Sequence, residues 1–243
     1  MKRHSLMRHS RFVAAFLMIS AVFAILGFVS YLGETDNVAA SSKLSENIAV
    51  VIDAGHGGED GGAVGVSGTL EKDINLNIAK MIYDLFAITD IDAVMTRTDD
   101  YLLYEESQSS RKKYFDVRNR VELANKFSSP VFLSIHQNKF PIAKYKGLQV
   151  YFSGNNSDSK IVAECIQNKT KIYLQKDNNR MIKQGGRNIF VLQNLECPAV
   201  LVECGFLSNP EDEANLNNPE YQKQIAFIIF SSVIDYINDK YKL

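Results

Sequence analysis

The sequence has few of the residues that build disulfide frameworks or cysteine metal sites. It contains three cysteines in 243 residues, and no two of them form a Cys-x-x-Cys pair. An odd and scattered set argues against a disulfide framework and against an all-cysteine metal site. We therefore expect Cys165, Cys197 and Cys204 to be small thiols inside the fold, although one pair can oxidise outside the cytoplasm.

Histidine is also scarce, and its distribution is informative. Two of the four histidines, His4 and His9, lie in a basic segment at the N-terminus. Beyond that segment the sequence has only His56 and His136, and each stands at the end of an apolar, strand-like run. A single histidine at a strand end is more often a packed core residue than a ligand. Two such residues together make a shared metal site an equally good interpretation.

The glycine-rich stretch around His56 lacks the features of a phosphate-binding loop. It has no Gly-Lys-Ser or Gly-Lys-Thr, and Asp60 stands where a Gly-x-Gly-x-x-Gly motif starting at Gly55 requires glycine. The stretch is therefore better explained as room for the imidazole of His56 and for sharp backbone turns.

Positive charge is concentrated in the first eleven residues. Lys2, Arg3, Arg8 and Arg11 contribute +4 there, without any acidic residue. Because the whole chain has a formal charge of −1, the remainder carries −5. A mildly acidic domain argues against a nucleic-acid partner.

A long apolar run follows the basic segment. Residues 12–32 contain no charged side chain, and 21 residues are enough for a helix to cross a bilayer. Since the positive side stays in the cytoplasm, the sequence predicts a cytoplasmic segment at 1–11, a transmembrane anchor at 12–32 and a polar tether at 33–46. The alternative is a signal sequence cleaved after residues 38–40, although such signals have shorter apolar regions. Either interpretation places the rest of the chain outside the cytoplasm.

The remainder, residues 47–243, alternates strand-like and helical patterns. Short β-branched runs predict strands, and apolar residues at helical spacing predict helices between them. The alternation predicts a single α/β domain with a mainly parallel, twisted sheet of about six strands and helices on both faces. We expect strands at 48–52, 91–96, 131–135, 147–152, 187–192 and 198–203, and helices at 71–86, 111–127, 158–174 and 219–238.

Four polar side chains stand at the ends of these predicted elements. His56, His136 and Glu203 end strands or follow them, and Glu71 opens the first helix. Because the carboxyl ends of parallel strands meet at one edge of a sheet, the four side chains can converge there. Two imidazoles and one carboxylate leave an open position on zinc, which makes hydroxide available near pH 7. The second carboxylate would move protons, and the spacing leaves open which carboxylate has which role.

Four stretches resemble, in order, the zinc-dependent N-acetylmuramoyl-L-alanine amidases, the bacterial cell-wall family often called amidase 3. They are VVIDAGHGGEDGGAVG from Val50, LEKDINLNIA from Leu70, LSIHQN from Leu133 and AVLVECGFLSNPED from Ala199. The likeness covers about residues 47–240.

The resemblance assigns roles that the spacing leaves open. It implies that His56, Glu71 and His136 hold one zinc ion per chain and that Glu203 is the catalytic carboxylate. Arg120 matches a helical motif of the family and is expected to brace the site. The family usually has proline in place of Ala54 and a smaller residue in place of Gln137. Neither departure removes a ligand, and we expect Gln137 at the rim of the cleft.

The resemblance also implies a substrate and a setting. The substrate is peptidoglycan, cut at the amide between N-acetylmuramic acid and the L-alanine of the stem peptide. A single domain behind an anchor is similar to the germination-specific amidases of spore formers, which act before muramic-lactam formation in the spore cortex. That setting implies the space between the forespore membranes and an activating protein partner. Asn138 and Arg187 are candidate substrate contacts, although Arg187 fits an ordinary solvated charge better.

Two other interpretations use the same residues. One is a different zinc hydrolase, such as a peptidase that cuts within the stem peptide. The other is a membrane-tethered wall-binding domain that has lost its activity. The presence of all four key residues argues against that loss.

Overall fold

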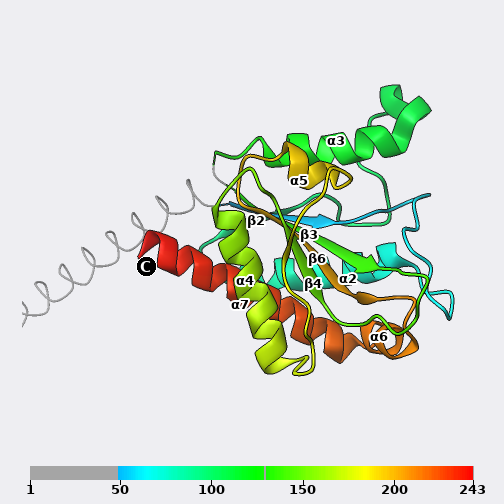
Figure 1. The fold of residues 1–243 in the computed structure, drawn as a ribbon. Helices are drawn as coiled ribbons and strands as arrows, with labels where there is room; N and C mark the ends of the chain where they lie inside the picture. Colours follow the sequence, from blue (N-terminus) through cyan, green and yellow to red (C-terminus); the bar gives the residue numbers. More distant parts are fainter. Residues whose placement is uncertain (1–48, 129, 243) are drawn as a thin grey trace, which may run out of the picture. The chain divides into compact units, whose positions relative to one another are not determined.

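The computed structural model describes residues 49–128 and 130–242 (Figure 1). Within them, six strands form one sheet in the order β2-β1-β3-β6-β4-β5. In chain order these are β1 (Ala49–Ala54), β2 (Asp92–Met95), β3 (Val131–Asn138), β4 (Gln149–Phe152), β5 (Lys183–Gln184) and β6 (Ala199–Phe206). The neighbours from β2 to β6 pair in parallel, whereas β4 runs antiparallel to β6. The prediction of one α/β domain with a mainly parallel sheet is confirmed.

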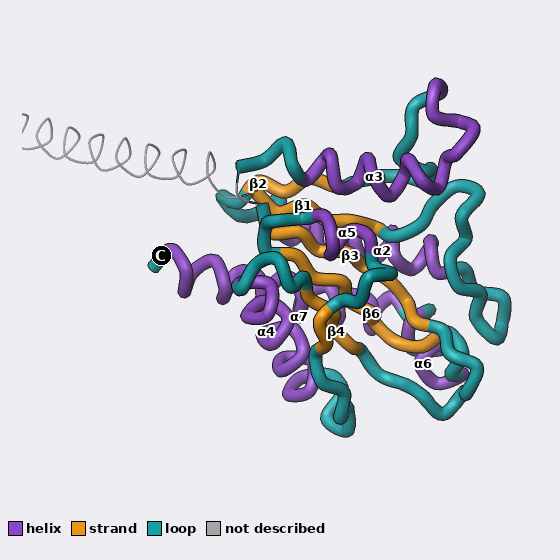
Figure 2. The backbone as a smooth tube through the Cα atoms, turned by 45° about the horizontal axis from the view of Figure 1, so that its top comes forward, coloured by secondary structure: helices purple, strands orange, loops and turns teal. Residues whose placement is uncertain are grey.

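Helices cover both faces of the sheet, as Figures 1 and 2 show. One face is covered by α3 (Lys112–Ala124) and α5 (Phe190–Asn194), and the 3-10 helix η1 (Glu106–Arg111) precedes α3. The other face carries α2 (Glu71–Phe86), α4 (Asp158–Tyr173) and α7 (Pro219–Tyr241). The short helix α6 (Pro210–Leu216) follows β6.

The alternation of side chains along each strand divides the core into two layers. Val51, Phe132 and Leu201 pack with residues of α3 and α5 in one hydrophobic cluster. Their neighbours in the strands therefore face α2, α4 and α7. On α2 the buried residues Ile74, Ile78 and Ile82 recur every four positions along one side of the helix. Burying each of these side chains contributes about 1.5–3 kcal/mol, which holds α2 against the sheet.

The apolar run at 187–192 is not a strand, contrary to the prediction. The strand at this edge of the sheet is instead β5, at Lys183–Gln184. The run at 187–192 forms a loop followed by the start of α5. Val191 and Leu192 bury their side chains in the cluster beneath α3. A short buried apolar run has no periodicity that separates a strand from one turn of helix, and here packing decides for the helix.

The helix α6 was not predicted, although its start carries a recognisable signal. The side chain of Asn209 accepts hydrogen bonds from the backbone N–H groups of Glu211 and Asp212, and Pro210 is the first helical residue. This is a standard N-terminal cap.

The predicted anchor at 12–32 and tether at 33–46 lie outside the described residues. In the part of the chain that the structure describes, no helix combines the length and the apolar character needed to cross a membrane. The three cysteines are free thiols, with Cys204 buried and Cys165 and Cys197 half-buried.

Candidate active site

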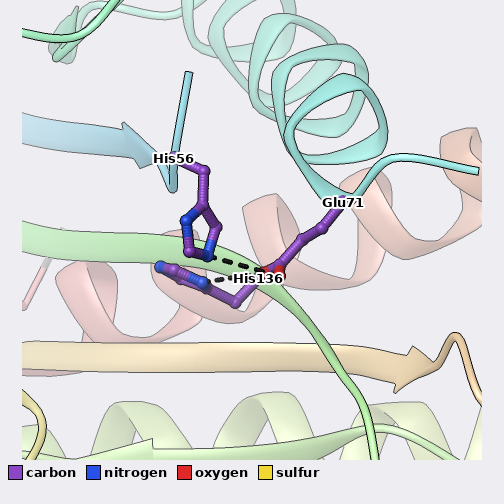
Figure 3. A group of neighbouring side chains, drawn as sticks. All are labelled: His56, Glu71 and His136. Carbon is purple, nitrogen blue, oxygen red and sulfur yellow. Dashed lines mark hydrogen bonds and ion pairs between the residues drawn. The ribbon is translucent and has the colours of Figure 1, made fainter. Parts of the chain in front are cut away.

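Three predicted site residues come together where β1 and β3 end (Figure 3). His56 follows β1, and His136 lies two residues before the end of β3. Glu71 is the first residue of α2. The carboxylate of Glu71 contacts both imidazoles, whose ring centres lie 5.0 Å apart in an edge-to-face arrangement. Its Oε1 atom lies 2.9 Å from Nδ1 of His136, and its Oε2 atom lies 3.3 Å from Nε2 of His56. One donor atom from each residue falls within 4.8 Å of the other two.

Two glycines allow this close approach. A Cβ atom on Gly55 would lie 2.2 Å from Nε2 of His136. A Cβ atom on Gly62 would lie 2.6 Å from Oε2 of Glu71, and Gly62 also has a φ of +67°. His56 itself has a φ of +62°, which is uncommon for a residue with a side chain. The glycine-rich stretch therefore leaves room for the site side chains, as the sequence predicts.

The donor set fits zinc. Nδ1 of His56 lies 2.9 Å from an oxygen of Asp60, which leaves Nε2 of His56 to face Glu71 and His136. Such an outer carboxylate fixes the tautomer of a metal-binding histidine. Two imidazoles and one carboxylate form a frequent catalytic zinc set, with a further position open for water or substrate.

The electrostatics of the protein alone show that this group favours a cation. Burial disfavours the charged form of His56. The hydrogen bonds with Glu71 and Asp60 and the negative charges of these two residues outweigh burial and raise the pKa of His56 to about 9. Burial likewise disfavours the Glu71 carboxylate, but the two histidines outweigh it and hold its pKa far below the usual range. A carboxylate that draws positive charge onto its neighbours is suited to hold a metal ion.

Glu203 lies beside this group, on the next strand. It is the register partner of His136 in the parallel pair β3–β6. Its Oε2 atom is buried and has no hydrogen-bond partner among the described residues. Burial, opposed by the charges of His136 and His56 and aided by that of Glu71, raises the pKa of Glu203 to about 7. A carboxyl group with a pKa near neutrality can both accept and donate a proton.

A buried network of charges supports the backbone at His56. Arg120 donates from Nη2 to the carbonyl oxygen of His56 at 2.9 Å, and it pairs with Asp53 and Asp116. Arg97 donates to the carbonyl oxygen of Ala54 at 2.8 Å. The Arg120 guanidinium, aided by Ser134 and His136, holds the pKa of Asp53 low despite its burial. Arg120 contacts the site as the sequence analysis expects.

Replacing Arg120 by methionine is expected to destabilise the fold by about 3–5 kcal/mol, because it leaves two buried carboxylates without their cation. Urea denaturation followed by circular dichroism measures this loss. Arg118→Met on the same helix is the matched control, since Arg118 is exposed and should change stability by less than about 0.5 kcal/mol. Equal effects of the two substitutions would contradict a supporting role for Arg120.

A cleft of about 250 Å³ lies beside His56 and His136, between α3 and the loop before α5. Asn188, Ile189 and Phe190 form its second wall. Neither candidate substrate contact lines this cleft. Arg187 is exposed in the loop before α5, and Asn138 is the last residue of β3.

Gln137 does not lie at the rim of the cleft, and this expectation is wrong. Only 3% of the residue is exposed, and Nε2 of Gln137 donates to Oδ1 of Asn75 on α2 at 3.1 Å. Side chains alternate along β3, so the residue after His136 points to the opposite face of the sheet.

Several residues that build the site were missed by the sequence analysis. They hold the ligand candidates in place: Asp60 contacts His56, and Asn75 donates to the carbonyl oxygen of Gly55 at 3.0 Å. Asp53 pairs with Arg120, which supports the backbone at His56. The available signal for Asp53 was a polar residue directly after the apolar run at 48–52, whereas Asp60 had none beyond its closeness to His56 in the chain.

The fold and the site define an α/β domain in which His56, Glu71 and His136 could hold a metal ion at the edge of the sheet. The comparison with protein families identifies the group to which it belongs. The family model described as N-acetylmuramoyl-L-alanine amidase (Amidase_3) matches residues 50–235, and the chain belongs to this family.

Individual relatives agree with this assignment. The chain is 35% identical over 193 residues to the germination-specific N-acetylmuramoyl-L-alanine amidase of Bacillus subtilis, covering 79% of this chain and 80% of that protein. The CwlD amidase of Clostridioides difficile, solved in complex with the GerS lipoprotein, is 36% identical with a TM-score of 0.74 and covers 79% of this chain and 98% of that one. Another amidase, from Clostridium difficile 630, is 34% identical with a TM-score of 0.70 and covers 81% and 100% of the two chains.

Proposed function

We propose that this amidase hydrolyses the bond between N-acetylmuramic acid and L-alanine in spore-cortex peptidoglycan, with one zinc ion held by His56, Glu71 and His136. The observation that carries the proposal is the buried carboxylate of Glu71 in contact with both imidazoles, with Glu203 on the strand adjacent to His136. Zinc held by these three residues would lower the pKa of water at the site and polarise the scissile carbonyl group.

The residues of the chain account for the remaining proton transfers. Glu203, with its raised pKa, takes the proton of the attacking water and gives it to the nitrogen of L-alanine as the amide bond breaks. Asp60 holds the ring of His56, and the buried position of Glu71 keeps water from its carboxylate. We place the muramic acid side of the substrate in the cleft beside α3, which His56 and His136 border.

The activity is tested by mass spectrometry of the products that the full 243-residue chain releases from purified peptidoglycan, with and without added zinc. Free stem peptides that begin with L-alanine, together with peptide-free muramic acid, would support the proposal. Peptides shortened elsewhere would instead show a stem-peptide peptidase. A protein that holds no zinc and releases nothing would show a wall-binding domain.

The spore setting is proposed from the relatives and from the N-terminal sequence. The names of the Bacillus subtilis and Clostridioides difficile relatives point to germination and to a lipoprotein partner. We place the domain outside the cytoplasm, between the forespore membranes, anchored by residues 12–32 or released after cleavage. Spores of a deletion strain should then lack muramic lactam in their cortex, and a normal lactam content would contradict this setting.

A protein activator is part of the same proposal. Affinity purification of the chain from sporulating cells should recover one partner in stoichiometric amount, and its addition should increase the release of stem peptides. Recovery of the chain alone, already at full activity, would count against an activator.

The pKa of Glu203 predicts the acid side of the pH profile. Below its pKa the carboxyl group is protonated and cannot accept the proton of water, so kcat/KM falls as pH falls. The protein alone places this pKa at about 7, and the positive charge of a bound zinc ion lowers it. We therefore expect the acid limb between about pH 5 and about pH 7, with a slope of about one. A flat profile from about pH 5 to about pH 8 would contradict this role.

A further inference from the structure

The order of the strands sets the site residues in a line along the edge of the sheet. His56 follows β1, His136 lies in β3 and Glu203 lies in β6. The next strand is β4, where Gln149 is the register partner of Glu203. Paired residues project to the same face, so the side chain of Gln149 lies beside Glu203 on the side of the sheet that carries the site.

Arg180, a positively charged residue, lies next to Gln149 at the end of this line. It stands in the segment between α4 and β5, and its Nη1 atom donates to Oε1 of Gln149 at 3.0 Å. The charges of Glu203 and Arg180 both act on the neighbouring phenol of Tyr151. Burial and the Glu203 carboxylate raise the pKa of Tyr151, whereas the Arg180 guanidinium opposes this increase.

The guanidinium of Arg180 is held in one orientation. Its Nε atom donates to the carbonyl oxygen of Lys146 at 2.8 Å. Its central carbon lies 4.3 Å from the ring centre of Phe206 and 5.9 Å from that of Tyr145. These contacts fix the plane of the group and lower the entropy that binding would cost.

Arg180 nevertheless keeps donors free. Among the described residues it forms no ion pair with a carboxylate, and its Nη2 atom makes no hydrogen bond. By contrast, the buried Arg120 is fully engaged with Asp53 and Asp116. A half-buried, stacked guanidinium with an unused pair of N–H groups is suited to bind a carboxylate from outside the chain.

The direction of the reaction indicates which part of the substrate reaches Arg180. Because Glu203 protonates the departing nitrogen, the nitrogen of L-alanine lies next to Glu203 when the bond breaks. The muramic acid side then extends toward His56 and α3, and the stem peptide extends across β4 toward β5. Two strand spacings separate β6 from β5, about 10 Å. An extended peptide covers this distance in about three residues.

We propose that Arg180 binds a free carboxylate on the second or third residue of the stem peptide. The proposal rests on the proposed function and adds a specificity contact to it: the enzyme distinguishes stem peptides by their charge at these positions. The contact is made before and during the reaction alike, so its effect falls on KM more than on kcat.

The test uses the full-length chain, loaded with zinc, and three synthetic N-acetylmuramoyl tripeptides. One carries free carboxylates on residues two and three, and each of the others has one of these carboxylates converted to an amide. We expect one amide to lower kcat/KM by about 10- to 100-fold, mainly through KM, which is the range for a hydrogen bond to a charged group. Equal kcat/KM for all three substrates would overturn the proposal for Arg180 while the amidase assignment stands. Hydrolysis of none of them would overturn the proposed function as well.

Substitution of Arg180 separates binding from a structural role. Arg180→Gln should lose the same 10- to 100-fold on the free-carboxylate substrate and nothing on the sensitive amide substrate. Lys176→Gln, an exposed lysine in the same segment, is the control and should change neither value. Equal losses on both substrates, or a lower zinc content in Arg180→Gln, would show that Arg180 only holds the loop and would overturn the proposal.

Discussion

Replacing Glu203 by glutamine is expected to lower kcat by about 10²- to 10⁴-fold while zinc remains bound. Glutamine has nearly the shape of glutamate but cannot take a proton from water or give one to the leaving nitrogen. The buried Oε2 atom of Glu203 and its pKa of about 7 make it the group that does both. Single-turnover hydrolysis of a muramoyl peptide gives the rate, and metal analysis of the same sample gives the zinc content.

The controls for Glu203→Gln separate chemistry from folding. Glu164→Gln replaces an exposed glutamate of α4 and should leave both rate and zinc content unchanged. A thermal melt of the Glu203 variant should match that of the unaltered protein within a few degrees. Loss of zinc from Glu203→Gln would mean that Glu203 is a ligand, and the roles of the two carboxylates would have to be exchanged.

Replacing His136 by alanine is expected to remove both the zinc ion and the activity. His136 supplies one of three donor atoms, all within 4.8 Å of one another, and the remaining pair of residues cannot close the site. The fall in zinc affinity should exceed the 10- to 100-fold that the loss of an outer supporting residue costs. Competition with a fluorescent chelator measures the affinity directly, without relying on turnover.

Asp60→Asn is compared with His136→Ala because it should weaken zinc binding less. Asp60 contacts Nδ1 of His56 and no other candidate ligand, so this variant should lose only about 10- to 100-fold in zinc affinity. Normal zinc binding by His136→Ala would identify His136 as a packed core histidine. The metal site would then need a different third ligand.

Much of the fold could be predicted because periodicity reports burial. The helix predicted at 71–86 has those bounds in α2, since its buried isoleucines lie on one side at regular spacing. The prediction failed at 187–192, where the same kind of apolar residues form a loop and α5. That segment is too short for its periodicity to distinguish a strand from a helix, and contacts beneath α3 determine its conformation.

The candidate site could be predicted in part for a similar reason. The rule that parallel strands end at a common edge was enough to expect His56, His136, Glu71 and Glu203 near one another. It could not identify the partners that orient them. Asp60 is four residues from His56, but Arg120 is 64 residues away and Asn75 reaches Gly55 from a helix. The expectation for Gln137 failed because strand alternation, once β3 continues past His136, turns that side chain inward.

The sequence by itself determined the class of the fold, the family and the residue types available for the chemistry. These follow from local patterns: the period of apolar residues, glycines where side chains must approach, and polar groups at strand ends. Only the tertiary structure decided how the carboxylates differ, because their pKa values depend on burial and on charges brought from distant parts of the chain. It places Glu71 in contact with two imidazoles and leaves Glu203 beside them with a buried Oε2 atom and a pKa near neutrality. Strand order, which no local pattern records, likewise aligns Gln149 and Arg180 beyond Glu203.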